Sequence, residues 1–114
     1  MVLDKQGGPN WFKNWCVAPV IVDPDKDEVY FTPIYYTLTH FSKYIRPGAV
    51  RIGFEISETD LMITAVENPD NSIVVVVFNQ DKQAKNFRIS SKDKFADVSI
   101  NGQAIQTIII NNLN

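Results

Sequence analysis

The spacing of apolar residues changes once along this chain, at Arg46-Pro47-Gly48, and this change constrains the fold more than any other feature. Before it, apolar residues recur at intervals of four, three and four, which places them on one face of a helix: Ile34, Leu38, Phe41 and Ile45. Thr32 is a favourable N-cap, and Pro33 suits the first helical position. We therefore predict one amphipathic helix from about residue 33 to 45, followed by a different kind of structure.

After Gly48 the apolar residues alternate with polar ones, which is typical of strands with one buried face. We predict six strands, over or around residues 50–56, 61–66, 73–78, 87–89, 95–100 and 104–110. The run Ile73 to Phe78 is apolar on both faces and should be a central strand covered on both sides. Asn101-Gly102 favours a two-residue hairpin turn between the last two strands. Short strands at this spacing indicate a β-sandwich.

The first thirty residues are less regular. Gly7-Gly8-Pro9-Asn10 has the composition of a turn, and Val17–Val22 and Val29–Phe31 are short apolar runs that predict a small irregular hairpin. Five aromatic residues accompany them, namely Trp11, Phe12, Trp15, Tyr30 and Phe31. These rings could form a satellite core under a loop, or they could line a cleft that binds carbohydrate.

Composition narrows the class of protein. The 114 residues are 45% hydrophobic and 21% charged, which is ordinary for a globular domain or part of one. The 11 basic and 13 acidic residues are spread along the chain without a basic stripe, so we expect no nucleic-acid partner. We also expect no membrane span and no signal peptide within this chain. Cys16 is the single cysteine, which rules out an internal disulfide.

The residue types of familiar catalytic sites are sparse here. Cys16 and His40 could form a nucleophile–base pair, but the ordinary interpretation is a small buried cysteine and a packed helix residue. One histidine and one cysteine cannot build a zinc site, so we predict neither a metal nor a cofactor.

The acidic residues also lack the arrangement of a catalytic pair. Several of them cluster in one turn and are best interpreted as solvated: Asp23, Asp25, Asp27 and Glu28. General acid–base catalysis needs one carboxyl group with a raised pKa near another that stays ionised, and no such pair of environments is indicated. The chain by itself is predicted to be non-catalytic.

Several segments together resemble family 30 glycoside hydrolases, especially the glucosylceramidase-like members. They are GGPNW at residues 7–11, Asn14-Trp15, APVIVD at residues 18–23, HFSKYIRPG at residues 40–48, and the turn and valine-rich strand over residues 68–79. GGPNW and HFSK followed by an aromatic residue and Ile are a specific signal when they occur at this separation. The similarity extends over nearly the whole chain.

The resemblance implies a mainly β chain that belongs to a larger enzyme with a (β/α)8 catalytic barrel and a side β-sandwich. Residues 1–47 correspond to the end of the catalytic barrel, with its last loop and last amphipathic helix, and residues 48–114 to the C-terminal segment of the sandwich. Family members act with retention through two glutamates on earlier barrel strands, so neither has a counterpart here. Asn14 and Trp15, with Trp11 behind them, are the expected substrate-lining residues.

The implied partner is a carbohydrate or glycolipid substrate bound through a parent protein that is secreted or periplasmic. Two alternatives remain. Residues 48–114 could be a free carbohydrate-binding module, although the phenylalanines in its strands occupy positions expected to be buried: Phe54, Phe78, Phe87 and Phe95. The chain could instead be an interaction module, whose exposed strand edges and apolar helix face make the isolated fragment a homodimer.

Overall fold

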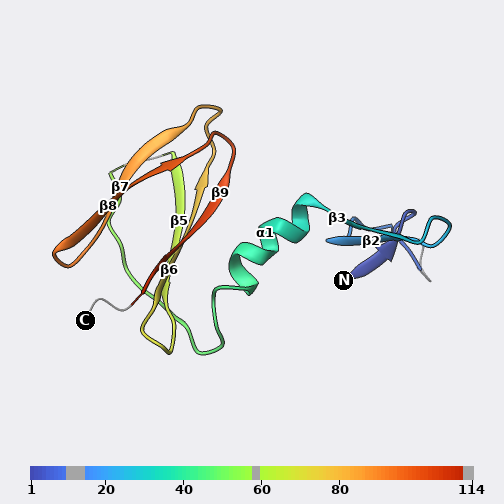
Figure 1. The fold of residues 1–114 in the computed structure, drawn as a ribbon, viewed down its shortest axis with the longest axis horizontal. Helices are drawn as coiled ribbons and strands as arrows, with labels where there is room; N and C mark the ends of the chain where they lie inside the picture. Colours follow the sequence, from blue (N-terminus) through green and yellow to red (C-terminus); the bar gives the residue numbers. More distant parts are fainter. Residues whose placement is uncertain (10–14, 58–59, 112–114) are drawn as a thin grey trace. The chain divides into compact units, whose positions relative to one another are not determined.

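The computed structural model describes residues 1–9, 15–57 and 60–111. It falls into two compact units, residues 1–41 and 42–114 (Figure 1). As predicted, the chain is mainly β, with one helix between an N-terminal segment and a β-sandwich.

The first unit contains a three-stranded sheet in the order β1-β2-β3. Strands β2 (Val20–Asp23) and β3 (Glu28–Phe31) form the predicted antiparallel hairpin. Strand β1 (Val2–Asp4) lies parallel to β2, and its pairing was not predicted, because three residues are too short to show a period. The long connection between β1 and β2 contains the GGPNW segment and the other candidate substrate-lining residues.

Helix α1 (Pro33–Ser42) begins where predicted and ends before the predicted limit near residue 45. The Thr32 carbonyl accepts a hydrogen bond from the Tyr35 amide at 3.0 Å, as an N-cap carbonyl does. None of the ten helix residues, all of which are described, is buried. The apolar residues exposed on α1 are Ile34, Tyr35, Tyr36, Leu38 and Phe41.

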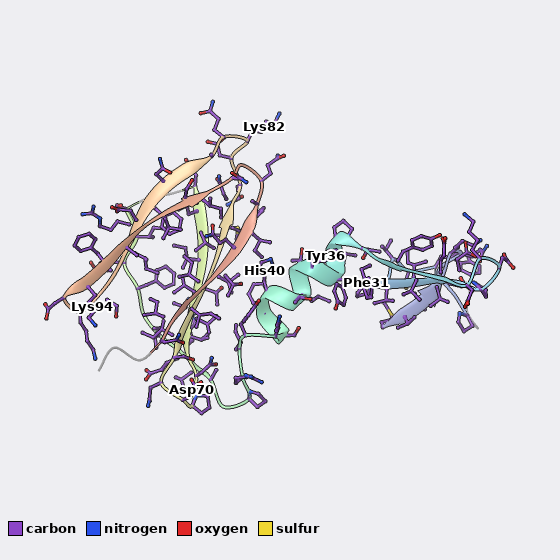
Figure 2. The ribbon with its side chains drawn as sticks, viewed as in Figure 1. Phe31, Tyr36, His40, Asp70, Lys82 and Lys94 are labelled. Atoms are coloured by element: carbon purple, nitrogen blue, oxygen red, sulfur yellow. The ribbon has the colours of Figure 1, made fainter. Side chains whose placement is uncertain are left out.

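The second unit is a sandwich of two antiparallel sheets. The larger sheet has the order β4-β5-β6-β9, and the smaller one pairs β7 with β8 (Figure 1). Their bounds are β4 Val50–Arg51, β5 Leu61–Glu67, β6 Ile73–Asn79, β7 Lys85–Ser91, β8 Lys94–Ile100 and β9 Ile105–Ile110. Lys94 lies at the tip of the β7–β8 hairpin, and Lys82 lies in the turn that precedes β7 (Figure 2).

Strand β6 is the predicted central strand, and it is buried on both faces. Val75 and Val77 belong to the core between the sheets, together with Leu61, Ala65 and Ile100. Val74 and Val76 pack on the opposite face with Val66, and the partly buried Tyr44, Ile45, Ala49 and Ile105 cover them. Fully burying a side chain of this kind stabilises the folded state by roughly 1.5–3 kcal/mol, so β6 anchors both layers.

The predicted strand over residues 50–56 is much shorter in the structure. Strand β4 covers Val50–Arg51, and the Ile52 amide adds one more bond to the Ala65 carbonyl at 3.0 Å. Residues 53–57 follow without strand pairing among the described residues. An alternating pattern indicates which face of a segment is apolar, but it does not supply a neighbour for the backbone.

The hairpin predicted at Asn101-Gly102 is wrong. Strand β8 pairs with β7 and β9 pairs with β6, so residues 101–104 cross from one sheet to the other. The physical role of Gly102 is close packing: a Cβ atom there would lie 2.0 Å from the Lys82 carbonyl oxygen. The neighbouring Gln103 amide donates to the Asp81 carbonyl at 2.7 Å, which ties the crossover to the β6–β7 turn.

Candidate functional site

The candidate substrate-lining residues belong to the connection between β1 and β2. Trp11 and Asn14 lie outside the described residues. Trp15 is described, and 59% of its surface is exposed. A large aromatic ring with this exposure is available to stack on a ligand or to contact another part of the protein.

The chain enters this connection through a tight turn organised by Asp4. The Asp4 Oδ1 atom accepts hydrogen bonds from the amides of Gln6 and Gly8, both at 2.9 Å. The Asp4 main chain makes two more bonds, accepting from the Gly7 amide at 3.0 Å and donating to the Gly8 carbonyl at 2.7 Å. We call residues 4–8 the Asp4 turn.

Gly7 brings the two ends of the connection together. Its φ of +83° is a conformation that favours glycine, and a Cβ atom there would lie 2.7 Å from the Cys16 carbonyl oxygen. The backbones at Gly7 and Cys16 are therefore in direct contact. Residues 9–15, which we call the candidate loop, lie between these two residues in the sequence.

The exit from the loop is held by Thr32. Ala18 is buried, and its carbonyl oxygen lies 3.0 Å from the Thr32 hydroxyl; the Pro19 carbonyl lies 3.1 Å from the same hydroxyl. The Thr32 amide also donates to the Pro19 carbonyl at 2.9 Å. The predicted capping residue thus turns its side chain back to the loop exit and links it to the start of α1.

One acidic residue of the Asp23–Glu28 turn is buried, so the solvated interpretation is wrong for Asp23. Its carboxylate lies 2.9 Å from the Lys5 ammonium group, in the Asp4 turn. The hydrogen bond from Lys5 lowers the pKa of Asp23, and the same bond raises the pKa of Lys5. This ion pair fastens the Asp4 turn to the end of β2.

The aromatic residues near the helix start are exposed rather than packed into a satellite core. Tyr30 and Phe31 on β3 are both exposed, and the Phe31 ring lies 4.6 Å from the Tyr35 ring of α1, measured between centroids. The Tyr30 hydroxyl donates to the Glu28 carboxylate, which raises the pKa of Tyr30. Trp15 shares this exposure, so the satellite-core interpretation is wrong for these three rings.

Cys16 and His40 are interpreted from the sequence as a small buried residue and a packed helix residue. The Cys16 thiol is exposed, so the interpretation of a small buried residue is wrong. His40 is half-buried in the last turn of α1. Within the described residues no group of three or more His, Cys, Asp or Glu side chains could hold a metal ion, and no helix is long and apolar enough to cross a membrane.

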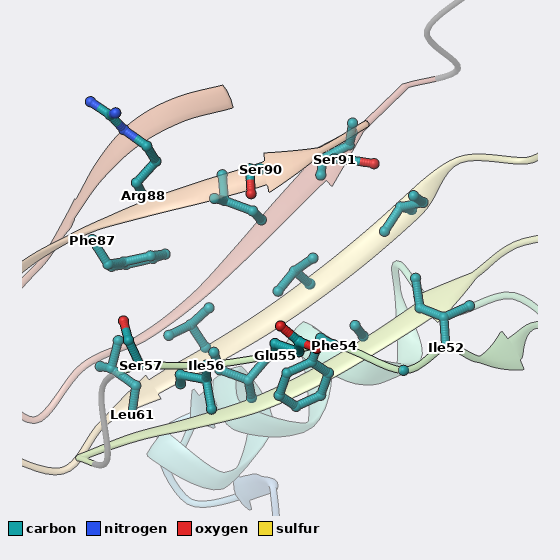
Figure 3. Close-up of a pocket in the computed structure, with 18 of the residues that line it drawn as sticks. Ile52, Phe54, Glu55, Ile56, Ser57, Leu61, Phe87, Arg88, Ser90 and Ser91 are labelled. Carbon is teal, nitrogen blue, oxygen red and sulfur yellow. The ribbon is translucent and has the colours of Figure 1, made fainter. Parts of the chain in front are cut away.

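A second feature is a groove of about 600 Å³ inside the sandwich unit. One wall is residues 52–57, the opposite wall is residues 86–91 of β7, and the floor is the inner face of β5 and β6. Phe87 points into this space while Arg88 points away from it (Figure 3). The exposed Phe54 and Ile56 also lie along it, so the groove opens an apolar core to the outside.

The outer face of the small sheet carries an exposed aromatic ring. Phe95 is 64% exposed, although its position in the sequence pattern predicted burial. Arg88 lies over this ring, 4.4 Å from its centroid, and forms a two-pronged contact with Asp97 at 2.7 and 3.0 Å. Phe54 and Phe78 are exposed as well, so only Phe87 among the four phenylalanines is partly buried as expected.

Comparisons with known proteins cover both units. Residues 48–108 match the glycosyl hydrolase family 30 beta sandwich domain, and residues 1–45 match the TIM-barrel domain of the same family. The chain is 40% identical over 111 residues to the lysosomal acid glucosylceramidase of Mus musculus, which covers 96% of this chain and 22% of that protein. It is 38% identical to putative glucosylceramidase 2 of Caenorhabditis elegans, which covers 98% of this chain and 23% of that protein.

Two solved structures are similar in fold. SrfJ from Salmonella typhimurium superposes with a TM-score of 0.93 at 29% identity, covering 98% of this chain and 25% of that one. The endo-beta1,6-glucanase BT3312 superposes with a TM-score of 0.83 at 24% identity, and the match covers 93% of this chain and 24% of that one. The chain thus spans about a quarter of the length of these proteins. With both family 30 domains matched in succession, this chain belongs to glycosyl hydrolase family 30.

Proposed function

We propose that this chain is the C-terminal part of a retaining β-glycosidase whose substrate is a glucosylceramide-like glycolipid. The observation that carries the proposal is the 40% identity to a lysosomal acid glucosylceramidase over 96% of the chain, extending through both units. In this proposal residues 1–47 complete the catalytic barrel and residues 48–114 complete the side sandwich. The matched ranges 1–45 and 48–108 support a boundary at this place.

The candidate loop is the part that we assign to the substrate. Trp15, with Asn14 and Trp11, would line the edge of the active site, where loops after barrel strands gather. The exposure of Trp15 supports this assignment, since a flat ring open to solvent can stack on a sugar. No catalytic carboxylate is assigned to this chain.

The electrostatics of the described carboxylates support a non-catalytic role. A general acid in a glycosidase needs a raised pKa. Within residues 1–9, 15–57 and 60–111, every aspartate with a shifted pKa has it lowered, by Lys5 at Asp23, Lys85 at Asp60, Ser72 at Asp70 and Arg88 at Asp97. These groups stay ionised at neutral pH and act as partners in ion pairs and turns.

The open apolar surfaces support a chain that is completed by further structure. Helix α1 exposes its apolar residues, and the groove between residues 52–57 and β7 leaves part of the sandwich core open. We propose that the remainder of the enzyme covers these surfaces and that the isolated chain covers them by forming a homodimer. Sedimentation equilibrium tests the second part: a monomer at high concentration would refute it.

The proposed activity is tested with the complete reading frame and the 114-residue chain side by side. The complete protein should hydrolyse an aryl β-glucoside and glucosylceramide, whereas the chain alone should not. Proton NMR of the first turnovers should show the β-anomer of glucose before mutarotation, which is the signature of retention. First release of the α-anomer would refute retention, and hydrolysis by the chain alone would refute the non-catalytic role.

One observation favours a second candidate, in which the sandwich binds carbohydrate by itself. Phe95 is exposed on the outer face of β7–β8, beside the Arg88–Asp97 pair, and a ring with polar neighbours is a suitable platform for a sugar. Calorimetric titration of oligosaccharides into the chain, with a Phe95→Ser variant as control, distinguishes the two. Saturable binding that the variant loses would favour the binding module.

A further inference from the structure

Trp15 lies beside the point where the two ends of the β1–β2 connection meet, so its position depends on what fastens those ends. The entrance is fastened by the four hydrogen bonds between Asp4 and residues 6–8. The exit is fastened by Thr32, and the two ends touch at Gly7 and Cys16. A displacement of the entrance is therefore transmitted across this contact to Trp15, which directly precedes Cys16.

Asp4 is the side chain on which the entrance depends. Both of its side-chain hydrogen bonds go to the same atom, Oδ1, and both donors are main-chain amides of the turn. One of these amides belongs to Gly8, which is buried. Removing the acceptor leaves that amide without this bond, and buried main-chain donors rarely remain unpaired in folded proteins. The turn would therefore rearrange to satisfy it.

We propose that Asp4 is a positioning residue for Trp15: its carboxyl oxygen shapes the turn that seats Gly7 against Cys16 and so sets the place of Trp15 at the active-site edge. The role of Trp15 in contacting substrate rests on the proposed function. Its positioning by Asp4 rests on the geometry alone. Asp4 itself touches main-chain groups of the turn and carries no role in bond breaking.

The geometry specifies which substitutions matter. Asn at position 4 retains an Oδ1 acceptor of the same shape, so Asp4→Asn should preserve the turn although it removes a charge. Asp4→Ala removes the acceptor and should not. Asp25→Ala is the matched control, because it also removes a carboxylate from the first unit. The Asp25 side chain is 85% exposed, and its carboxylate lies 3.6 Å from the Lys5 ammonium group in the Asp4 turn.

The first experiment measures positioning without reference to catalysis. Trp11 and Trp15 are the only tryptophans of the chain, so a Trp11→Phe background labelled with 5-fluorotryptophan yields one fluorine resonance, from Trp15. Asp4→Ala should shift this resonance towards that of free fluorotryptophan. Asp4→Asn and Asp25→Ala should leave it in place. An unshifted resonance in Asp4→Ala overturns the proposal, whatever the enzyme does.

The second experiment uses the complete enzyme and an aryl β-glucoside, at a temperature where circular dichroism shows all variants folded. Misplacing a substrate-contacting group by about 1 Å can cost on the order of a hundredfold in rate. We expect Asp4→Ala to lower kcat/KM by about ten- to a hundredfold with a raised KM, and Asp4→Asn to stay within about twofold of the wild type.

The two experiments separate the possible failures. A variant that merely lost folded protein would lower the apparent kcat and leave KM unchanged, which would overturn a positioning role. A shifted fluorine resonance together with an unchanged KM, in an active enzyme, would overturn the link between Trp15 and the substrate. A shifted resonance in a complete protein without glycosidase activity would retain the positioning role and refute the proposed function.

Discussion

Replacing Asn79 by alanine should destabilise the sandwich unit more than almost any other polar substitution in it. Asn79 lies at the end of β6, and none of its surface is exposed. Its amide nitrogen donates to the carbonyls of Gln83 at 2.8 Å and Asn101 at 3.0 Å, and its Oδ1 atom accepts from the Asp81 amide at 3.1 Å. One side chain therefore joins the central strand to the β6–β7 turn and to the crossover between the sheets.

The magnitude follows from these three bonds. Each contributes a net of about 0.5–1.5 kcal/mol, and main-chain groups left unpaired in a buried place cost a further part of their desolvation energy. We expect Asn79→Ala to lower the free energy of unfolding by roughly 2–4 kcal/mol. For a unit of this size, 1 kcal/mol corresponds to a shift in Tm of roughly 4–8 °C, so the variant should melt at least about 8 °C lower.

The assay is urea unfolding of the chain followed by far-ultraviolet circular dichroism. Asn86→Ala is the matched control, since it makes the same substitution at an exposed position of β7 and should stay within about 0.5 kcal/mol of the wild type. If Asn79→Ala were as stable as Asn86→Ala, the hydrogen bonds of Asn79 would not stabilise the junction between the two sheets. A change in the slope of the unfolding free energy against urea concentration would instead indicate that the folded or unfolded state had changed in compactness.

Two further predictions concern other fixed points of the fold. Gly102→Ala should destabilise the sandwich by more than about 2 kcal/mol, because its Cβ would meet the Lys82 carbonyl oxygen at 2.0 Å. Gly53→Ala is the control and should not destabilise it, since nothing lies within 4 Å of the added Cβ. Equal melting temperatures of the two variants would contradict this prediction. Lys5 lowers the pKa of Asp23 from 3.8, so their ion pair should stabilise the first unit above that pH and lose its effect as the pH falls through the lowered value. Asp23→Asn should therefore be less stable than the wild type at pH 7 and converge with it in acid, as tryptophan fluorescence can report; a constant difference across pH would refute the pairing.

The two ends of the candidate loop are held by contacts with main-chain atoms. The side chains of Asp4 and Thr32 bond to main-chain groups and Gly7 has no side chain, and none of the three stands out in the sequence as a site residue. Their importance comes from where they lie, at the two ends of the loop that holds Trp15. A signal was nevertheless available, since glycine pairs followed by proline mark positions where the backbone turns sharply.

The elements that depend on local pattern follow from the amino-acid sequence alone. The helix that begins at residue 33, the doubly buried strand β6 and the hairpin β2–β3 were all predictable, because period and turn chemistry act between residues close in the chain. The resemblance to family 30 was equally local, carried by short motifs at a fixed separation, and the matches over residues 1–45 and 48–108 confirm it.

The pairing of strands and the burial of their faces depend on contacts that form in three dimensions. Asn101-Gly102 suits a hairpin by its residues, yet β8 joins β7 and β9 joins β6, since the choice of partner depends on contacts between residues far apart in the chain. The same holds for Phe95, which is exposed in a strand of apolar pattern, and for Asp23, which is buried in an acidic turn because Lys5 lies beside it. The local pattern indicates which face of an element is apolar or polar. Residues far away in the sequence determine whether that face is buried, because they supply the contacts that cover it.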